Sequence, residues 1–364
     1  MKDAEKNGVE KCFQTVRGKF RIRTFTPGDE ISFLSLWKSA FKQEMSLPYF
    51  YWKYLENPFG CQIFLCEEES SGKIIAFFAG VPYKANYKGT IINITQLMDS
   101  MSHPLYRGTG LFVSTAQFFF EHYGQRREYN YYYGFPGIFH FKLGNKYLNY
   151  NRVSNPVFLS YRFTKDNVSG QLFQGRIDRV FEINTDFNDL FKTCLSDYPF
   201  SVIRNKDFLD WRFINHPEKK YEIWGYYSKV SDKLKGYIVF SRENKVAQIV
   251  DIFVVHSKEI IKDFILQLRQ MLHKGRIRKI QVLLPDNHFI THTLFSLGFT
   301  PIRQPAYIVR KILYIIGRLF AFTGYKAVTL PLEIIPTFRS LYDTKPSLEW
   351  VSDNIFYTMA DGDF

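Results

Sequence analysis

The 364-residue sequence predicts an α+β protein built from two tandem domains that share one fold. Three short landmarks occur twice, in the same order and 152 to 159 residues apart. The first is a tryptophan six residues before a proline, at Trp52 and Trp211. The second is a Gln-x-x-Asp segment within a strand, at Gln96 and Gln248, and the third is a Leu-Gly pair, at Leu143 and Leu297. A repeated order of landmarks at a nearly fixed distance indicates a duplicated unit.

The first half begins with alternating strand and helix patterns. Residues 20–25 (FRIRTF) alternate apolar and charged side chains, as a half-buried strand does. Residues 26–29 (TPGD) give turn and N-cap signals for a helix through about Phe41, and a second helix is expected over 47–55. Strands are expected at 61–66, 73–81 and 83–87, of which the first two form a hairpin.

A central strand, 91–102, then leads through a short glycine-containing loop into a helix at 111–122. A strand at 128–134, a short helix before Leu143-Gly144 and a strand at 156–163 complete the first half. The second half repeats this order of strands and helix at 221–227, 235–240, 247–255, 260–273 and 279–284.

These patterns divide the chain into five segments. We expect a polar leader, a first domain, a linker, a second domain and a C-terminal helical tail, at 1–17, 18–165, 166–175, 176–312 and 313–364.

Composition points to a globular protein with an anionic partner. Lys and Arg number 48 against 35 acidic residues, which gives a net charge of +13, and this favours a nucleotide-like ligand, nucleic acid or an acidic membrane face. The four cysteines form no CxxC pair, so we expect reduced thiols in the cytoplasm. We expect no signal peptide, since residues 1–11 contain no apolar run, and no spanning helix, since the apolar run at 312–322 is short and contains Arg318.

The loop after the central strand has the chemistry of an anion site. Arg107-Gly108-Thr109-Gly110 joins the strand to the helix that starts at Leu111. Loop amides and the positive end of a helix attract a phosphate, and glycines let the backbone approach it closely. At this place the second half has the stretch VVHSKEIIKDF, which contains no glycine, so only the first half is expected to hold a phosphate.

With this loop, the chain resembles the GNAT superfamily of acyl-CoA N-acyltransferases in a tandem arrangement. The family's Arg/Gln-x-x-Gly-x-Gly/Ala loop corresponds to Arg107 to Phe112, and Phe112 departs from it by replacing a small residue. Pro104 before the loop and the Leu-Gly pairs are also similar to the family pattern. The resemblance implies a mixed, mostly antiparallel central sheet flanked by helices in each domain, and acetyl-CoA as the donor without a metal.

The resemblance also implies a donor site in the first domain. The pantetheine arm would run along Ser100, Met101 and Ser102, and the pyrophosphate would lie on the amides of Arg107, Gly108, Thr109, Gly110, Leu111 and Phe112.

Catalytic candidates follow from the same comparison. The family's usual tyrosine acid, four residues before the Leu-Gly glycine, is replaced here by His140, and Tyr131, Tyr133 and Tyr147 are alternative acids. Asp99, on the central strand just before the loop, is the candidate base. Because Asp251 repeats Asp99 in the half without a loop, a structural role competes with catalysis.

The expected reaction is direct acyl transfer to a primary amine of a small molecule, and the Phe135-Pro136-Gly137 turn favours an amino sugar because it is similar to a turn in acetyltransferases of polysaccharide pathways. Two alternatives stay open: a Fem-type aminoacyl-tRNA-dependent transferase, and a non-catalytic basic module that binds nucleic acid or membrane. A zinc site is not expected at His288 and His292, because Phe289 replaces the glutamate of an HExxH motif.

Overall fold

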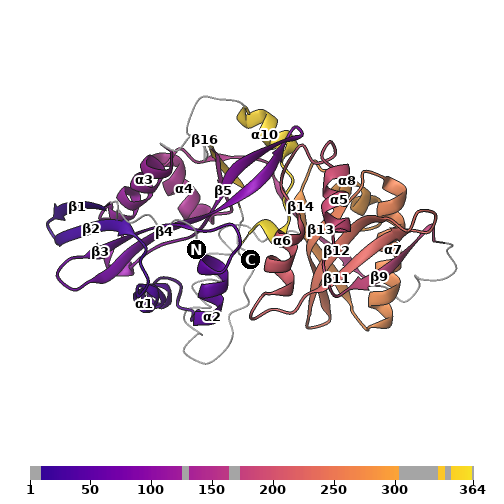
Figure 1. The fold of residues 1–364 in the computed structure, drawn as a ribbon, viewed down its shortest axis with the longest axis horizontal. Helices are drawn as coiled ribbons and strands as arrows, with labels where there is room; N and C mark the ends of the chain where they lie inside the picture. The colour runs from indigo at the N-terminus through magenta and orange to yellow at the C-terminus, as the bar shows by residue number, and fades with distance from the viewer. Residues whose placement is uncertain (1–9, 125–130, 164–172, 303–334, 341–345, 363–364) are drawn as a thin grey trace.

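The computed structural model describes residues 10–124, 131–163, 173–302, 335–340 and 346–362, in two sheets that lie side by side (Figure 1). The first sheet has nine strands: β1 (Glu10–Thr15), β2 (Gly18–Thr24), β3 (Gln62–Glu68), β4 (Lys73–Tyr87), β5 (Thr90–Ser102), β6 (Tyr131–Gly134), β16 (Thr337–Ser340) and β7 (Asn151–Arg152) in spatial order, with β10 (Phe200–Val202) also paired to β4. The parallel pair in it is β5–β6.

The helices of the first half cover both faces of this sheet. They are α1 (Glu30–Phe41), α2 (Leu47–Phe50), the π-helix η1 (Tyr51–Leu55), the 3₁₀ turn η2 (Pro104–Tyr106), α3 (Leu111–Gly124) and α4 (Ile138–Tyr147). Helices α1 and α2 lie on one face and α3 and α4 on the other (Figure 1). On the α3 side the buried cluster is largely aromatic, with Phe64, Phe78, Phe119 and Phe120 at its centre.

The second sheet has seven strands. They are β15 (Thr300–Pro301), β8 (Pro156–Arg162), β14 (Lys279–Pro285), β13 (Val246–Val254), β12 (Leu234–Glu243), β11 (Glu222–Ser228) and β9 (Gly175–Val180) in spatial order. Its parallel pair is β13–β14, which corresponds to β5–β6 of the first sheet. The predicted mixed, mostly antiparallel sheets are therefore confirmed.

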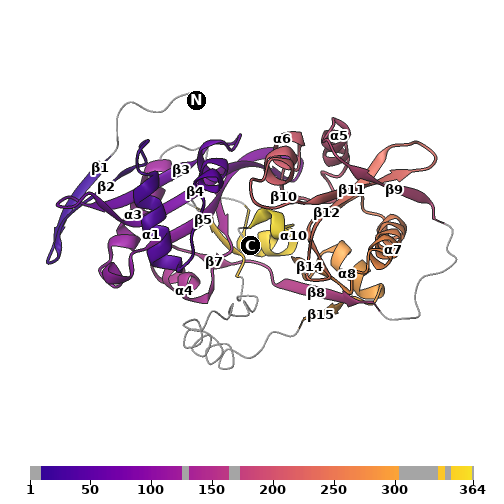
Figure 2. The same cartoon turned by 90° about the horizontal axis from the view of Figure 1, so that it is seen from below.

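Two groups of helices flank the second sheet on opposite faces (Figure 2). One group is α5 (Asp186–Thr193), α6 (Lys206–Leu209) and the π-helix η3 (Asp210–Ile214), and the other is α7 (Lys258–Lys274) and α8 (Phe289–Ser296). The C-terminal helix α10 (Leu348–Asn354) and the 3₁₀ turn η5 (Met359–Asp361) lie between the two domains in both views (Figures 1 and 2).

The two halves exchange a strand. Strand β8 leaves the first half and pairs with β14 and β15 in the second sheet, whereas β16, close to the C-terminus, pairs with β6 and β7 in the first sheet. Each exchanged strand fills the same place in its host sheet. Hence neither sheet is built from one continuous stretch of chain, whereas the sequence led us to expect a first domain that ends at residue 165.

Some predicted segments differ in detail. Strand β1 lies in the segment that we expected to be a polar leader, and β4 continues through 83–87, where a separate strand was expected. The tail at 313–364, expected to be helical, contributes strand β16 as well as α10, and its residues 313–334 lie outside the described part. No helix of the described residues has the length and apolar character needed to cross a membrane.

A pair of tryptophans joins the domains at the first repeated landmark. The indole N–H of Trp52 donates to the carbonyl of Trp211 (2.9 Å), and that of Trp211 donates to the carbonyl of Trp52 (3.0 Å). The two rings stack with centroids 4.9 Å apart, and each belongs to a π-helix that follows a short α-helix. The repeat read from the sequence is thus also a contact between corresponding residues.

Candidate functional site

The loop between β5 and α3 has the backbone that an anion site requires. Gly108 and Gly110 have φ values of +80° and +84°, a region that side-chain-bearing residues seldom adopt. A Cβ at either position would meet nothing within 4 Å, and both glycines are exposed. Helix α3 starts directly afterwards at Leu111, and its first amides have no carbonyl one turn earlier in the helix. These amides can therefore bind a phosphate from solvent.

Cationic side chains surround this loop. Arg107 is exposed within it, and the Arg17 guanidinium donates to the carbonyl of Leu105 just before it. The Lys73 ammonium lies 3.2 Å from the imidazole of His103. Burial lowers the pKa of His103, and the positive charges of Lys73, Lys42 and Arg107 lower it further. The first turn of α3 carries no acidic residue that would oppose an anionic ligand at its N-terminus.

A gap opens beside the loop where β5 and β6 separate. The two strands pair from Ile94 and Tyr131 to Gln96 and Tyr133, and in the described part of the chain no further pair joins them. Residues 101 and 102 continue to pair with β4 on the other side. The backbone of Ser100 to Ser102 thus presents its second edge to the gap, where an extended ligand could add as a strand does.

Asp99 lies at a β-bulge in this strand. The register of β4 and β5 shifts between Phe77 and Ala79, and Asp99 has φ +47°, which is uncommon for a non-glycine residue. Its carboxylate forms an ion pair with Lys53 (2.5 Å) and accepts a hydrogen bond from the Tyr54 hydroxyl. The side chains of Lys53 and Asp99 are 3% and 6% exposed, so this is a buried charge pair. Strained backbone and buried charge are both typical of functional positions.

Phe112 and His140 pack together behind the loop. The Phe112 ring contacts Phe78 (centroids 5.9 Å apart) and His140 (5.5 Å), so the bulky residue fills the space between β4 and α4. The imidazole also stacks on the Tyr150 ring, with an interplanar angle of 10°. This enclosure lowers the pKa of His140 to about 4. At neutral pH the imidazole is uncharged, which weakens its candidacy as an acid that protonates a thiolate.

We expect the His140 ring to titrate near pH 4 rather than near its ordinary value of about 6.5. Since burial depresses the pKa only in the folded chain, the unfolded chain binds this proton more readily, and His140 should destabilise the fold as the pH falls from about 6.5 toward 4. NMR of the imidazole carbon-bound protons measures the midpoint. A midpoint above 6 would show that the ring is hydrated and would restore its candidacy as an acid.

The first Leu-Gly pair has a steric explanation. A Cβ on Gly144 would lie 2.1 Å from the Tyr150 ring, which folds back onto α4 while its amide donates to the Gly144 carbonyl (3.2 Å). In the second pair, Gly298 instead has φ +85° and follows the end of α8. The two repeated glycines are thus needed for different reasons.

Gly144→Ala should destabilise the protein by about 2 kcal/mol or more, because the added methyl overpacks a fully formed core. Denaturant unfolding measures the loss. Gly137→Ala is the matched control, since its Cβ meets nothing within 4 Å and its φ of −70° suits alanine. Tyr150→Ala should remove most of the Gly144→Ala penalty when the two are combined, and additive losses would contradict this explanation.

The candidate tyrosines differ in their position relative to the gap and in their surroundings. Tyr133 is 5% exposed and pairs with Gln96 at the last position before β5 and β6 separate. Tyr131 stacks on Phe338 of β16, and Tyr147 is about half exposed on α4 beside Lys146. Tyr133 is therefore the tyrosine at the apex of the gap.

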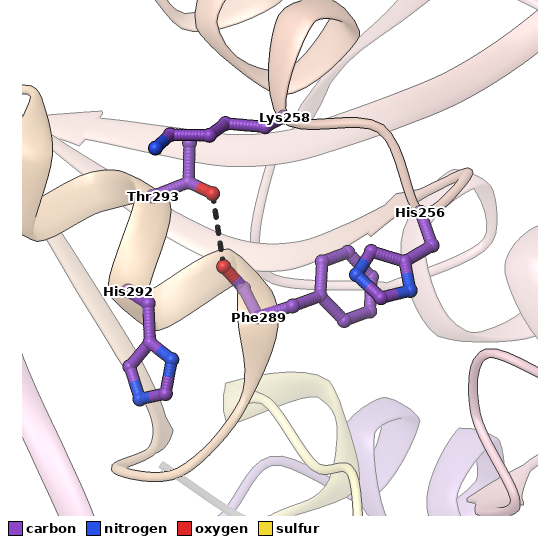
Figure 3. Close-up of a pocket in the computed structure, with 5 residues that line it drawn as sticks. All are labelled: His256, Lys258, Phe289, His292 and Thr293. Atoms are coloured by element: carbon purple, nitrogen blue, oxygen red, sulfur yellow. Dashed lines mark hydrogen bonds between the residues drawn. The ribbon is translucent and has the colours of Figure 1, made fainter.

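The corresponding part of the second domain lacks the loop. Strand β13 leads almost directly into α7, whose first turn is capped by the Ser257 hydroxyl. A small pocket of about 200 Å³ lies between these ends and α8, lined by His256, Lys258, Phe289, His292 and Thr293 (Figure 3). His256 stacks on Phe289 there, with centroids 4.1 Å apart. No group of three potential metal ligands is present among the described residues.

Asp251 has different partners from Asp99 although it occupies the repeated position. It is fully buried, accepts hydrogen bonds from Tyr237 (2.9 Å) and Thr358 (2.8 Å), and lies 3.6 Å from the Arg204 guanidinium. The repeated aspartate thus stabilises the interior of the second domain.

Sequence reasoning missed the partners of the site residues. Lys53 and Tyr54 stand in the WKYLENP landmark and were interpreted only as part of a helix. A lysine and a tyrosine within an otherwise apolar helical segment were the available signal. Arg17 lies in a turn that was assigned to the leader and gave no signal.

Comparison with known proteins agrees with this geometry. The family model of the acetyltransferase (GNAT) domain matches residues 21–147. Comparison with curated proteins by sequence gives no match.

Solved structures share the arrangement over most of the chain. A probable N-acyltransferase from Enterococcus faecalis V583 is 17% identical (TM-score 0.59), with 73% of this chain and 65% of that chain covered, so the chain spans just under two thirds of that relative. A GCN5-related N-acetyltransferase from Anabaena variabilis is 17% identical (TM-score 0.62; 78% and 70% covered). A tandem GNAT protein from the clavulanic acid biosynthesis pathway is 11% identical (TM-score 0.52; 78% and 95% covered). The chain therefore has the tandem GNAT fold.

Proposed function

We propose that this chain, which has the tandem GNAT fold and whose residues 21–147 match the family model of the acetyltransferase (GNAT) domain, is an acyl-CoA-dependent N-acyltransferase. The observation that carries the proposal is the loop at Gly108 and Gly110, which has positive φ values, open space in front of its amides and cations around it. In the described residues, the place that corresponds to it in the second domain has no such loop. We infer one donor site, in the first domain.

The donor would use three features of the first domain. Its pyrophosphate would bind the amides from Gly108 to Phe112, near Arg107 and Lys73. Its pantetheine arm would pair with the open edge of Ser100 to Ser102, which places the thioester near the bulge. A phosphorylated donor fits because the loop is open at both glycines, where an added Cβ would meet nothing within 4 Å.

The chemistry would be direct transfer. The amine nitrogen attacks the thioester carbonyl carbon, an N–C bond forms and the C–S bond breaks. Asp99, oriented by Lys53 and Tyr54, would accept the proton that the amine loses. A strand amide near Ser100 would stabilise the oxyanion, and the departing thiolate would take a proton from Tyr133, because the His140 imidazole is uncharged at neutral pH.

The acceptor is proposed by chemistry alone. A primary amine of a small molecule suits direct transfer, an amino sugar is our first choice, and acetyl is the proposed acyl group because the matching family model is that of an acetyltransferase. The four free cysteines fit a reducing compartment, and we place the protein in the cytoplasm.

Calorimetric titration of the full chain with acetyl-CoA tests the donor. A thiol-release assay over amino sugars, polyamines, amino acids and protein lysines then tests the acceptor. We expect saturable binding and release of CoA with at least one amine class. No binding of acetyl-CoA or of longer acyl-CoAs would overturn the proposal, and binding without release for any amine would leave only the donor half of it standing.

A further inference from the structure

The second domain has a gap between strands like the one proposed to take the donor in the first. Strands β13 and β14 pair from Val246 and Lys279 to Ile249 and Val282 and then separate. Beyond this point, among the described residues, β13 has no strand partner on this side over residues 250–253, and at Val254 the Tyr198 hydroxyl bonds both the backbone amide and the backbone carbonyl. An open strand edge with buried surroundings requires a partner.

The C-terminal segment, residues 355–362, occupies this gap. Its turn η5 packs against both β13 and β14. The Thr358 hydroxyl donates to Asp251 on β13 (2.8 Å), and the side-chain amide of Gln248, one residue before the last pair of the two strands, contacts the Met359 sulfur (3.0 Å). Phe356, Thr358 and Asp361 are each at most 2% exposed, so the segment is enclosed.

Two arginines of the second domain hold the segment. Arg204 is fully buried and forms an ion pair with Asp361, and its guanidinium also faces Asp251. Arg212 donates to the carbonyls of Ala360 (3.1 Å) and Gly362 (2.9 Å). Hydrogen bonds from arginines to backbone carbonyls and to one buried carboxylate are contacts of the kind that bind a peptide ligand.

We propose that the second domain is a receptor for residues 355–362 of its own chain, which fill the place that corresponds to the donor gap of the first domain. Consequently the second domain takes no acyl-CoA. The identification of residues 355–362 as the occupant rests on the contacts described above and not on the proposed acyltransferase activity. Only the stoichiometry below rests on the proposed function.

Hydrogen exchange of the full chain, followed by mass spectrometry, tests this inference. In the wild type, residues 355–362 should exchange as slowly as the central strands. Thr358→Val keeps the side-chain shape but removes the bond to Asp251 and the cap of η5, and should speed exchange of 355–362 by about tenfold. Residues 62–102 of the first sheet should be unchanged.

Thr293→Val is the matched control, because Thr293 is also buried (5% exposed) but bonds only within α8. It should leave 355–362 protected. Arg204→Met should release the segment more fully than Thr358→Val does. If Arg204→Met fails to fold, the comparison of Thr358→Val with Thr293→Val still tests the proposal. Fast exchange of 355–362 in the wild type, or equal protection in both threonine variants, would overturn the proposal.

Calorimetry separates this inference from the proposed function. One acetyl-CoA bound per wild-type chain supports both. Two bound per chain would overturn the receptor role of the second domain and leave the enzymatic proposal intact. No binding, together with a protected C-terminal segment, would overturn the enzymatic proposal and leave the receptor role standing.

Discussion

Gly110→Trp should weaken acetyl-CoA binding by at least about 100-fold, or about 3 kcal/mol. The indole would stand in the open space in front of the loop amides, where the proposed pyrophosphate lies. Calorimetric titration of wild type and variant measures the ratio of the two dissociation constants. The stability of the variant is measured in parallel by denaturant unfolding.

Gly89→Trp is the matched control for this change. Gly89 has the same φ of +84° and the same open surroundings, but it lies in the turn between β4 and β5 at the other end of the strand from the loop. Backbone strain should therefore be similar in the two variants. Equal affinity of Gly110→Trp and Gly89→Trp for acetyl-CoA would contradict the donor pose.

Asp99→Asn should lower kcat/KM by about 10²- to 10⁴-fold, the usual contribution of a general base. The amide can still accept the hydrogen bond from Tyr54, but the buried Lys53 loses its counter-ion, so the stability of the variant is measured in parallel by denaturant unfolding. Acetyl-CoA binding should stay within about threefold of wild type, because the proposed phosphate contacts are untouched. The thiol-release assay measures turnover.

Asp232→Asn provides the reference for this change. Asp232 also has a positive φ (+53°), but it lies in an exposed turn of the second domain. Its replacement should leave kcat/KM unaltered. If Asp99→Asn turns over at the wild-type rate, Asp99 only shapes the bulge, and the proton must leave through water.

The sequence was sufficient for features that local patterns encode. Strand, loop and helix at 91–122 were predicted because glycine, proline and strand alternation each have local causes. The duplication was predicted because the order of landmarks survives in the sequence. The strand exchange was not predicted, since the alternation in β8 and β16 shows that each is a strand but not which sheet it joins.

The site was predicted less completely than the fold. Asp99 and Asp251 look alike in sequence, yet one pairs with Lys53 and the other with Tyr237, Thr358 and Arg204. Partners so distant along the chain come from tertiary packing and leave no periodic signal. The low pKa of His140 likewise arises from the rings of Phe112 and Tyr150, which only folding brings to it.

The reciprocal contact of Trp52 and Trp211 bears on the symmetry of the chain. Each indole donates to the other's carbonyl, which is what an isologous homodimer does at its two-fold axis. Two identical subunits must keep identical surfaces, because every substitution appears twice. A single polypeptide is free of that constraint, so its two halves can differ in the loops after their central strands. The tryptophan pair therefore has the form of a pseudo-two-fold contact between two halves that are not identical.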